Sequence, residues 1–199
     1  MKKRRVRPRV MLVLLTLVAL GAWLYQGDLP AEVVDAKYTS PSSQFLTLDD
    51  GARIHFRDEG NRTGLPVVLI HGSMASLHTW APWVERLGKT YRIITLDLPA
   101  HGLTGAVPSG DYSGAAQLRV VQAVTSHLNL DAFVLGGNSM GGGVSWRYAL
   151  KHPGSVLALI LVDATGPSAW YRARRDAKPD QESPLAFKLL RQPWFRAIA

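Results

Sequence analysis

The chain has 199 residues, of which 47% are hydrophobic and 19% are charged, a balance typical of a globular domain rather than a disordered chain. It has no cysteine, which excludes a disulfide framework, a thiolate metal site and a cysteine nucleophile. Its formal charge is +8, but the basic residues gather at residues 2–9 and 172–178, and the region between them has no basic cluster. We therefore predict no nucleic-acid partner.

Residues 1–25 combine a basic start with an uncharged apolar run, "VMLVLLTLVALGAWLY", at residues 10–25. This run would form about 24 Å of helix, and Arg9, Trp23 and Tyr25 would suit the two membrane interfaces. We predict a transmembrane anchor that makes the chain a single-pass membrane protein with its C-terminal domain outside the cytoplasm, on the periplasmic side. A cleaved signal peptide is the alternative, with Ala19-Leu20-Gly21 as its site and a secreted product.

Residues 26–44 contain proline, serine and mixed charge without clear periodicity, and we expect a linker. "FLTLDDGARIHFRDEG", at residues 45–60, predicts two strands around an Asp50-Gly51 turn. After that, apolar runs predict buried strands at residues 65–72, 91–102, 132–139 and 156–166, and helical patterns lie at residues 77–91, 113–128 and 140–151. This alternation predicts an α/β fold with a mostly parallel sheet and antiparallel strands at its start.

The sequence "GNSMG", at residues 137–141, places Ser139 between a predicted buried strand and a predicted helix. In that context the G-x-S-x-G pattern indicates a nucleophile elbow, a turn so tight that the positions two before and two after the serine must be small. The serine oxygen then lies at a helix N-terminus, where negative charge is stabilised. A flexible glycine-rich loop or a phosphate-binding turn is the alternative, but no lysine follows as it does in a P-loop.

Acyl transfer also needs two N–H donors for the oxyanion of the tetrahedral intermediate. The backbone N–H of Met140, directly after the nucleophile, is one candidate. The other is a backbone N–H from "HGSM", at residues 71–74, which ends a predicted strand; we assign it to Ser73. We interpret His71 as a residue that fixes the shape of this loop rather than as a base.

Four motifs occur in one order along the chain: "HGS" at residues 71–73, "DLPAHG" at 97–102, "GNSMGG" at 137–142 and "LVDATG" at 161–166. With them the chain resembles the α/β-hydrolase-fold family, and its membrane-anchored bacterial members in particular. One departure is Ala100, where the family usually has glycine. The resemblance implies that residues 45–166 form the N-terminal part of a hydrolase domain and that residues 167–199 begin a helical cap. The pattern stops within that cap, so we expect a truncated chain in which the C-terminal strands of the sheet are missing.

The resemblance also implies that a catalytic acid and histidine follow the nucleophile in the chain. Only His152 follows Ser139, and it lies about 18 Å away along the same predicted helix. We therefore expect the catalytic histidine to be absent from this chain. Asp163, at the end of the next strand, is the candidate acid, although this aspartate more often shapes a loop in the family. His78 and His101 lie on loops on the same side of the sheet as Ser139 and are weak candidates for a base.

These observations predict a serine hydrolase that acts on a carboxylic ester or a related acyl bond of a small-molecule substrate, without a metal or an organic cofactor. A serine at position 139 argues against epoxide and haloalkane hydrolysis, because both reactions need a carboxylate nucleophile. The alternative is a catalytically incomplete, membrane-anchored chain that has a binding role or none.

Overall fold

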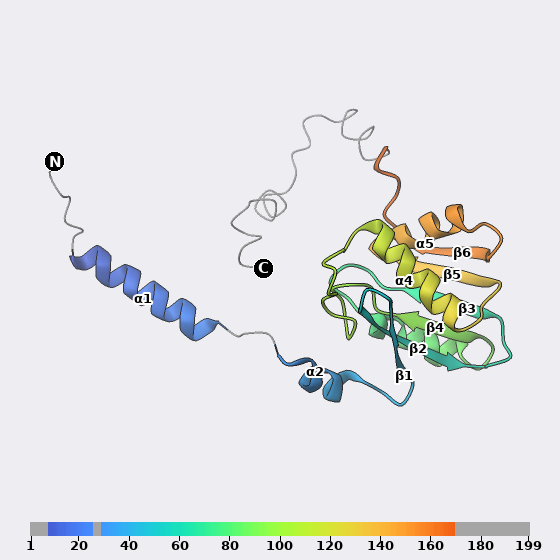
Figure 1. Ribbon diagram of the computed structural model, residues 1–199, viewed down its shortest axis with the longest axis horizontal. Coiled ribbons are helices and arrows are strands. Elements are labelled where there is room, and N and C mark those ends of the chain that lie inside the picture. Colours follow the sequence, from blue (N-terminus) through green and yellow to red (C-terminus); the bar gives the residue numbers. More distant parts are fainter. Residues whose placement is uncertain (1–7, 26–28, 170–199) are drawn as a thin grey trace. The chain divides into compact units, whose positions relative to one another are not determined.

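The computed structural model describes residues 8–25 and 29–169. The chain divides into two compact units, Met1–Tyr38 and Thr39–Ala199, and each is described by itself (Figure 1).

The first unit contains two helices, α1 at Pro8–Leu24 and α2 at Ala31–Tyr38. The 17 residues of α1 form about 26 Å of helix, whereas the hydrocarbon core of a membrane is about 30 Å thick. Within residues 8–25 and 29–169, no helix is both long enough and apolar enough to cross a membrane. The predicted transmembrane anchor, and with it the predicted single-pass membrane location, is therefore wrong. The segment expected to be a linker, residues 26–44, contains α2 and the first residues of β1.

The second unit is built on a six-stranded sheet with the strand order β1-β2-β4-β3-β5-β6. β1 pairs antiparallel with β2, and β2 pairs antiparallel with β4, whereas the pairs β4–β3, β3–β5 and β5–β6 are parallel. This arrangement confirms the predicted α/β fold with antiparallel strands at its start. The strands are β1 Ser43–Thr47, β2 Arg53–Gly60, β3 Pro66–Ile70, β4 Arg92–Leu96, β5 Phe133–Asn138 and β6 Val156–Val162.

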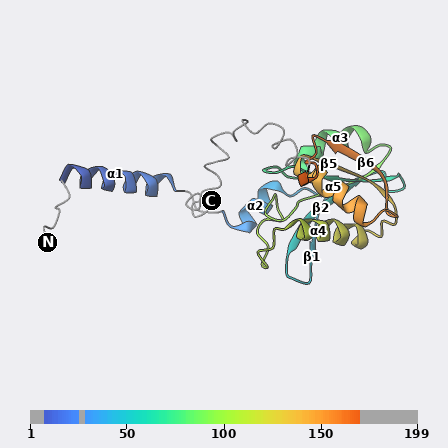
Figure 2. The same cartoon turned by 90° about the horizontal axis from the view of Figure 1, so that it is seen from above.

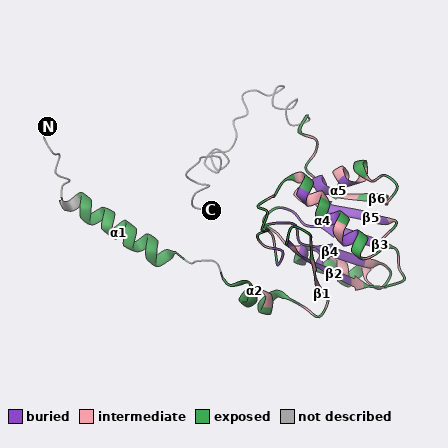
Figure 3. Cartoon of the chain, viewed as in Figure 1, coloured by how far each residue is buried: buried purple, intermediate pink, exposed green. Residues whose placement is uncertain are grey.

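Helices cover both faces of the sheet, and Figure 2 shows α3 and α4 on opposite sides of it. Val121 and Val124 of α4 and Tyr148 of α5 pack in one core cluster with residues of the central strands. Trp80 belongs to a second cluster on the other face, against which α3 packs. The central strands between the two layers are largely buried (Figure 3). The helical elements of this unit are the 3-10 helix η1 Leu77–Trp80, α3 Ala81–Leu87, α4 Gly114–His127 and α5 Met140–Lys151.

The parallel strands bring three loops to one edge of the sheet. Ile70 of β3 lies in register with Leu96 of β4 and with Gly137 of β5. The residues that follow these strand ends therefore lie close together, although they are far apart in the sequence. Residues 170–199, nearly all of the predicted start of a cap, lie outside the described residues.

Candidate active site

Ser139, the predicted nucleophile, occupies the turn between β5 and α5, at the N-cap position of that helix. Its backbone has φ of 51° and ψ of −113°, and such strained conformations cost about 1–3 kcal/mol. The Ser139 N–H donates to the carbonyl of Val162 at 2.9 Å, and the Ser139 carbonyl accepts from the N–H groups of Gly143 at 3.1 Å and Thr165 at 2.9 Å. These bonds tie the strained turn both to α5 and to the end of β6.

The two glycines that flank this turn leave no room for a side chain. A Cβ atom at Gly137 would overlap the backbone of Gly141, and a Cβ at Gly141 would overlap the carbonyl oxygens of Ile70 and His71. The end of β5, the start of α5 and the end of β3 thus approach one another to backbone contact. Only glycine permits that approach, which explains the glycine pattern around the serine.

The loop after β3, residues 71–76, lies directly beside the turn; we call it the β3 loop. A Cβ at Gly72 would stand 3.3 Å from Ser139 Cβ and 2.7 Å from Asn138 Oδ1. The Ser73 hydroxyl donates to Met140 Sδ at 3.4 Å. The structure therefore brings the predicted nucleophile and both residues predicted as oxyanion donors together.

His71 is fully buried at the start of the β3 loop, and both of its ring nitrogens bond to backbone groups. Nε2 accepts the N–H of Leu98 at 3.1 Å, so Nδ1 carries the hydrogen and donates to the carbonyl of Gly72 at 2.7 Å. Burial lowers the pKa of this imidazole, although the hydrogen bond to Gly72 and the charge of Asp97 oppose that shift. A neutral ring that joins the β3 loop to the residues after β4 is a structural element rather than a base.

The other histidines of the chain also have partners away from Ser139. His101 Nδ1 donates to the carbonyl of Pro99 at 2.9 Å. His152 ends α5 and stacks on Tyr148. Within residues 8–25 and 29–169, no hydrogen bond joins a histidine to Ser139. The remaining three bond or pack elsewhere: His55 on Ser43 and Asp97, His78 on Ser76 and Arg57, and His127 against Phe56.

Asp97, at the carboxyl end of β4, joins several segments near the site through its side chain, and no role for it was predicted from the sequence. It is fully buried and accepts hydrogen bonds from the N–H groups of Leu77 at 2.7 Å and Leu103 at 3.0 Å, and from His55 Nδ1 at 2.7 Å. Burial raises the pKa of this carboxyl, but the bonds from His55, Leu77 and Leu103 outweigh it and hold the pKa below its ordinary value. The carboxylate thus fastens the segment after β3 and the segment after β4 to β2.

A family model described as the alpha/beta hydrolase fold matches residues 66–189 of the chain. The chain belongs to the α/β-hydrolase family. Lipase 1 of Psychrobacter immobilis is 34% identical over 122 residues, which are 61% of this chain and 38% of that relative. The 2-hydroxy-6-oxo-6-phenylhexa-2,4-dienoate hydrolase of Burkholderia cepacia is 29% identical over 162 residues, 77% of this chain and 55% of the relative.

A crystal structure of an esterase from Rhodococcus sp. matches this α/β hydrolase with a TM-score of 0.56 and 33% identity, over 62% of this chain and 46% of the esterase. These relatives are named as hydrolases of different substrates. The chain spans about half of their length or less.

Asp163, the candidate acid, directly follows β6 in this α/β hydrolase. Its side chain is exposed and its φ is 46°, so the chain turns sharply at this residue. Such a conformation is uncommon for a residue with a side chain but is tolerated by aspartate. The structure therefore leaves its role as an acid a prediction.

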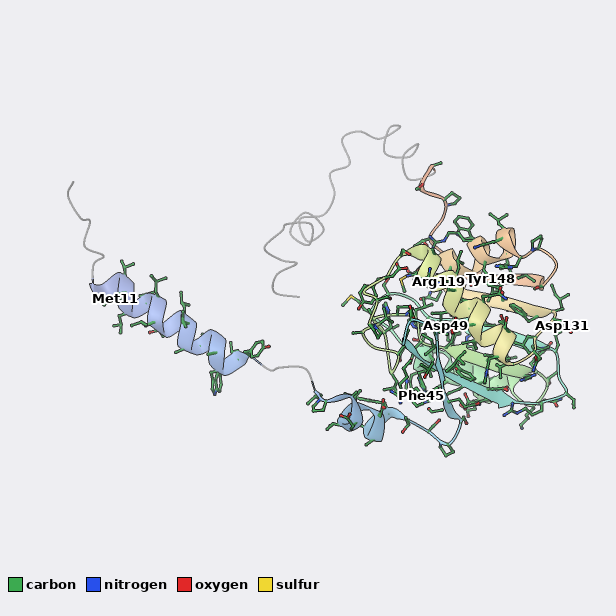
Figure 4. The ribbon with its side chains drawn as sticks, in the orientation of Figure 1. Met11, Phe45, Asp49, Arg119, Asp131 and Tyr148 are labelled. Atoms are coloured by element: carbon green, nitrogen blue, oxygen red, sulfur yellow. The ribbon has the colours of Figure 1, made fainter. Side chains whose placement is uncertain are left out.

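An open groove of about 960 Å³ lies elsewhere on the second unit of this α/β hydrolase, between the turn after β1 and α4. Asp49 and Arg119, which are labelled in Figure 4, belong to its two walls. Ser139, Ser73 and Met140 do not line it. The groove is therefore separate from the nucleophile turn.

Proposed function

We propose that residues 45–166 carry a site that hydrolyses carboxylic esters or related acyl bonds, with Ser139 as the nucleophile. The observation that carries the proposal is the strained backbone of Ser139 at the β5–α5 turn, with the β3 loop packed beside it. The relatives named as a lipase and an esterase support ester substrates, and the relative named as a dienoate hydrolase makes a related acyl bond a second class.

In this proposal the Ser139 oxygen attacks the acyl carbon, and the bond to the leaving alcohol breaks as that alcohol takes up the proton that the Ser139 hydroxyl gives up. Water then cleaves the acyl-serine ester and releases the acid. The N–H groups of Met140 and Ser73 would donate to the oxyanion in both steps. Donors of this kind contribute about 3–4 kcal/mol each to stabilisation of the transition state. Asp163 is the proposed catalytic aspartate, the acidic residue that accompanies a catalytic histidine.

None of the six histidines of the chain is placed to act as a base for Ser139 in this arrangement, because each of them bonds or packs elsewhere. A general base contributes about 10²–10⁴-fold to such a reaction. We therefore expect the 199-residue chain to turn over esters only slowly. The same observation favours a second candidate, a chain that binds its ligand without turning it over.

The test measures p-nitrophenyl ester hydrolysis and phosphonylation by a fluorophosphonate probe, with and without imidazole as an added base. We expect imidazole to accelerate both reactions at least about tenfold in the wild type, because it supplies the proton acceptor that the six histidines do not. Once the rate with imidazole in the absence of protein is subtracted, Ser139→Ala should abolish the acceleration, whereas Ser126→Ala, which removes an exposed serine of α4, should retain it. Acceleration that survives in Ser139→Ala would contradict the proposal, and a wild type that binds substrate without any acceleration would favour the second candidate.

A further inference from the structure

Ser43, the first residue of the edge strand β1, is a junction of hydrogen bonds. Its Oγ lies 2.8 Å from His55 Nε2, 3.2 Å from Arg57 Nε and 3.0 Å from the backbone nitrogen of Ser40. The N–H groups of Ser40 and Arg57 can only donate, so they occupy both lone pairs of the oxygen. The hydroxyl hydrogen is left to donate to His55 Nε2, and every bonding position of this oxygen is used.

One series of hydrogen bonds leads from Ser43 through His55 to the end of the β3 loop. His55 Nδ1 donates to Asp97 Oδ2 at 2.7 Å, and Asp97 Oδ1 accepts the N–H of Leu77, the residue directly after the loop, at 2.7 Å. The side chains of His55 and Asp97 are completely buried. A buried polar group that loses its partner costs about 1–3 kcal/mol, so this series of hydrogen bonds is held firmly.

A second series of hydrogen bonds leads from the same oxygen to Ser76, the loop residue next to Leu77. Arg57 Nη2 lies 3.0 Å from His78 Nε2, and since a guanidinium can only donate, that nitrogen accepts. Nδ1 of His78 therefore carries the hydrogen and donates to Ser76 Oγ at 3.1 Å. The two series of hydrogen bonds start at one oxygen on β1 and end on consecutive residues, Ser76 and Leu77.

The spacing of Ser43, His55 and Asp97 resembles that of a serine-histidine-aspartate triad, which raises the question of a second nucleophile. Nucleophilic attack requires a lone pair on the serine oxygen. Both lone pairs of Ser43 Oγ accept N–H bonds. The arrangement therefore holds structure in place rather than performing acyl transfer.

We infer that Ser43 is a positioning residue, whose hydroxyl anchors the C-terminal end of the β3 loop to the edge of the sheet. Ser73 lies within this loop, so the anchor sets the position of its N–H group relative to Ser139. The two series of hydrogen bonds are the basis for inferring this anchoring. Its catalytic consequence rests on the proposed function, in which the Ser73 N–H is an oxyanion donor.

The test compares Ser43→Ala with Ser43→Thr, which retains a hydroxyl. The control is Ser42→Ala, which removes the hydroxyl of the adjacent serine, a residue that belongs to neither series of hydrogen bonds. Amide hydrogen exchange of a peptide covering residues 71–78 reports on the loop without any activity. We expect exchange about tenfold faster in Ser43→Ala, because the loop opens more often. Ser43→Thr and Ser42→Ala should exchange as the wild type does, and circular dichroism verifies that each variant is folded.

The second readout is the rate of imidazole-assisted phosphonylation of Ser139. We expect a fall of about ten- to a hundredfold in Ser43→Ala, because small displacements of a donor have effects of that size, and recovery in Ser43→Thr. If exchange in Ser43→Ala equals that in Ser42→Ala, the inference is wrong, whatever the labelling shows. If exchange rises while the wild type shows no labelling of Ser139, the anchor is supported and the proposed function fails.

Discussion

The two sides of the candidate site are held by different forces. On the side of Ser139, backbone packs directly on backbone, and Gly137 and Gly141 are the residues that permit it. On the side of the β3 loop, the chain is held at a distance by hydrogen bonds that converge on the buried carboxylate of Asp97. The nucleophile turn is thus a steric construction, whereas the β3 loop beyond His71 is held mainly by hydrogen bonds, and the two sides should fail differently when altered.

The first prediction concerns the steric side and has the largest expected effect. Gly137→Ala or Gly141→Ala should destabilise the chain by about 4 kcal/mol or more, because a single added carbon overlaps backbone that cannot turn away. This corresponds to a fall in melting temperature of about 10 °C. Gly154→Ala is the matched control, because a Cβ at Gly154 would have no neighbour within 4 Å. Equal melting temperatures for the three variants would show that the turn is not sterically fixed.

The contrast also explains what the sequence could predict. The steric side is local: five consecutive residues, Gly137 to Gly141, contain the pattern, and the strand and helix around it are legible from their own periodicity. The order of strands and helices, and hence the α/β fold, follows from the same local signals.

The polar side joins residues that are far apart. His55 and Asp97 are separated by 42 positions and Leu77 and Asp97 by 20, and a single sequence contains no local signal for either pair. Asp97 stands in the "DLPAHG" motif, yet its partners depend on the register of β2 against β4. Ala100 in the same motif has φ of 65°, which is why glycine is the easier residue there. The anchor prediction failed for another reason, because hydrophobicity identified a helix that is too short to cross a membrane.

The second prediction concerns the centre of the polar side. Asp97→Asn keeps the shape of the side chain but turns one acceptor oxygen into an NH₂ group, which then faces a donor. We expect a loss of about 2 kcal/mol in the free energy of unfolding, because at least one buried donor loses its partner. Asp111→Asn is the control: Asp111 also has a lowered pKa, of about 2, but its side chain is partly exposed and is paired with Arg119. We expect a much smaller loss in that variant, because solvent screens its ion pair, and an equal loss in both would refute the special role of Asp97.

The third prediction is the pH dependence of that loss. The folded chain holds the pKa of Asp97 below its ordinary value of 3.8, so the unfolded state binds the proton first as the pH falls. The stability that Asp97 contributes is therefore complete above about pH 5 and decreases below it. The difference between wild type and Asp97→Asn, measured by urea unfolding, should shrink between pH 5 and pH 3 (both about one pH unit from that ordinary value). A difference that stays constant would contradict the charge-based account.

His71 gives the same measurement a separate window. Burial lowers its pKa below the ordinary 6.5, so the unfolded state takes up this proton first as the pH falls through that value. Its effect on stability therefore begins near neutral pH, and because the charge of Asp97 opposes this pKa shift, the effect should be larger in Asp97→Asn than in the wild type.

The last prediction concerns Gly72, where the two sides touch. A Cβ there would meet Asn138 Oδ1 at 2.7 Å and Ser139 Cβ at 3.3 Å, which are side-chain atoms rather than backbone. Asn138 can turn away if it gives up its hydrogen bond to the carbonyl of Val162. We therefore expect Gly72→Ala to cost only about 1 kcal/mol, far less than Gly137→Ala. Adding Asn138→Ala should remove part of that cost, so that a double-mutant cycle shows a coupling between the two positions. Strictly additive effects, or a Gly72→Ala variant as unstable as Gly137→Ala, would mean that the β3 loop is also held by backbone packing.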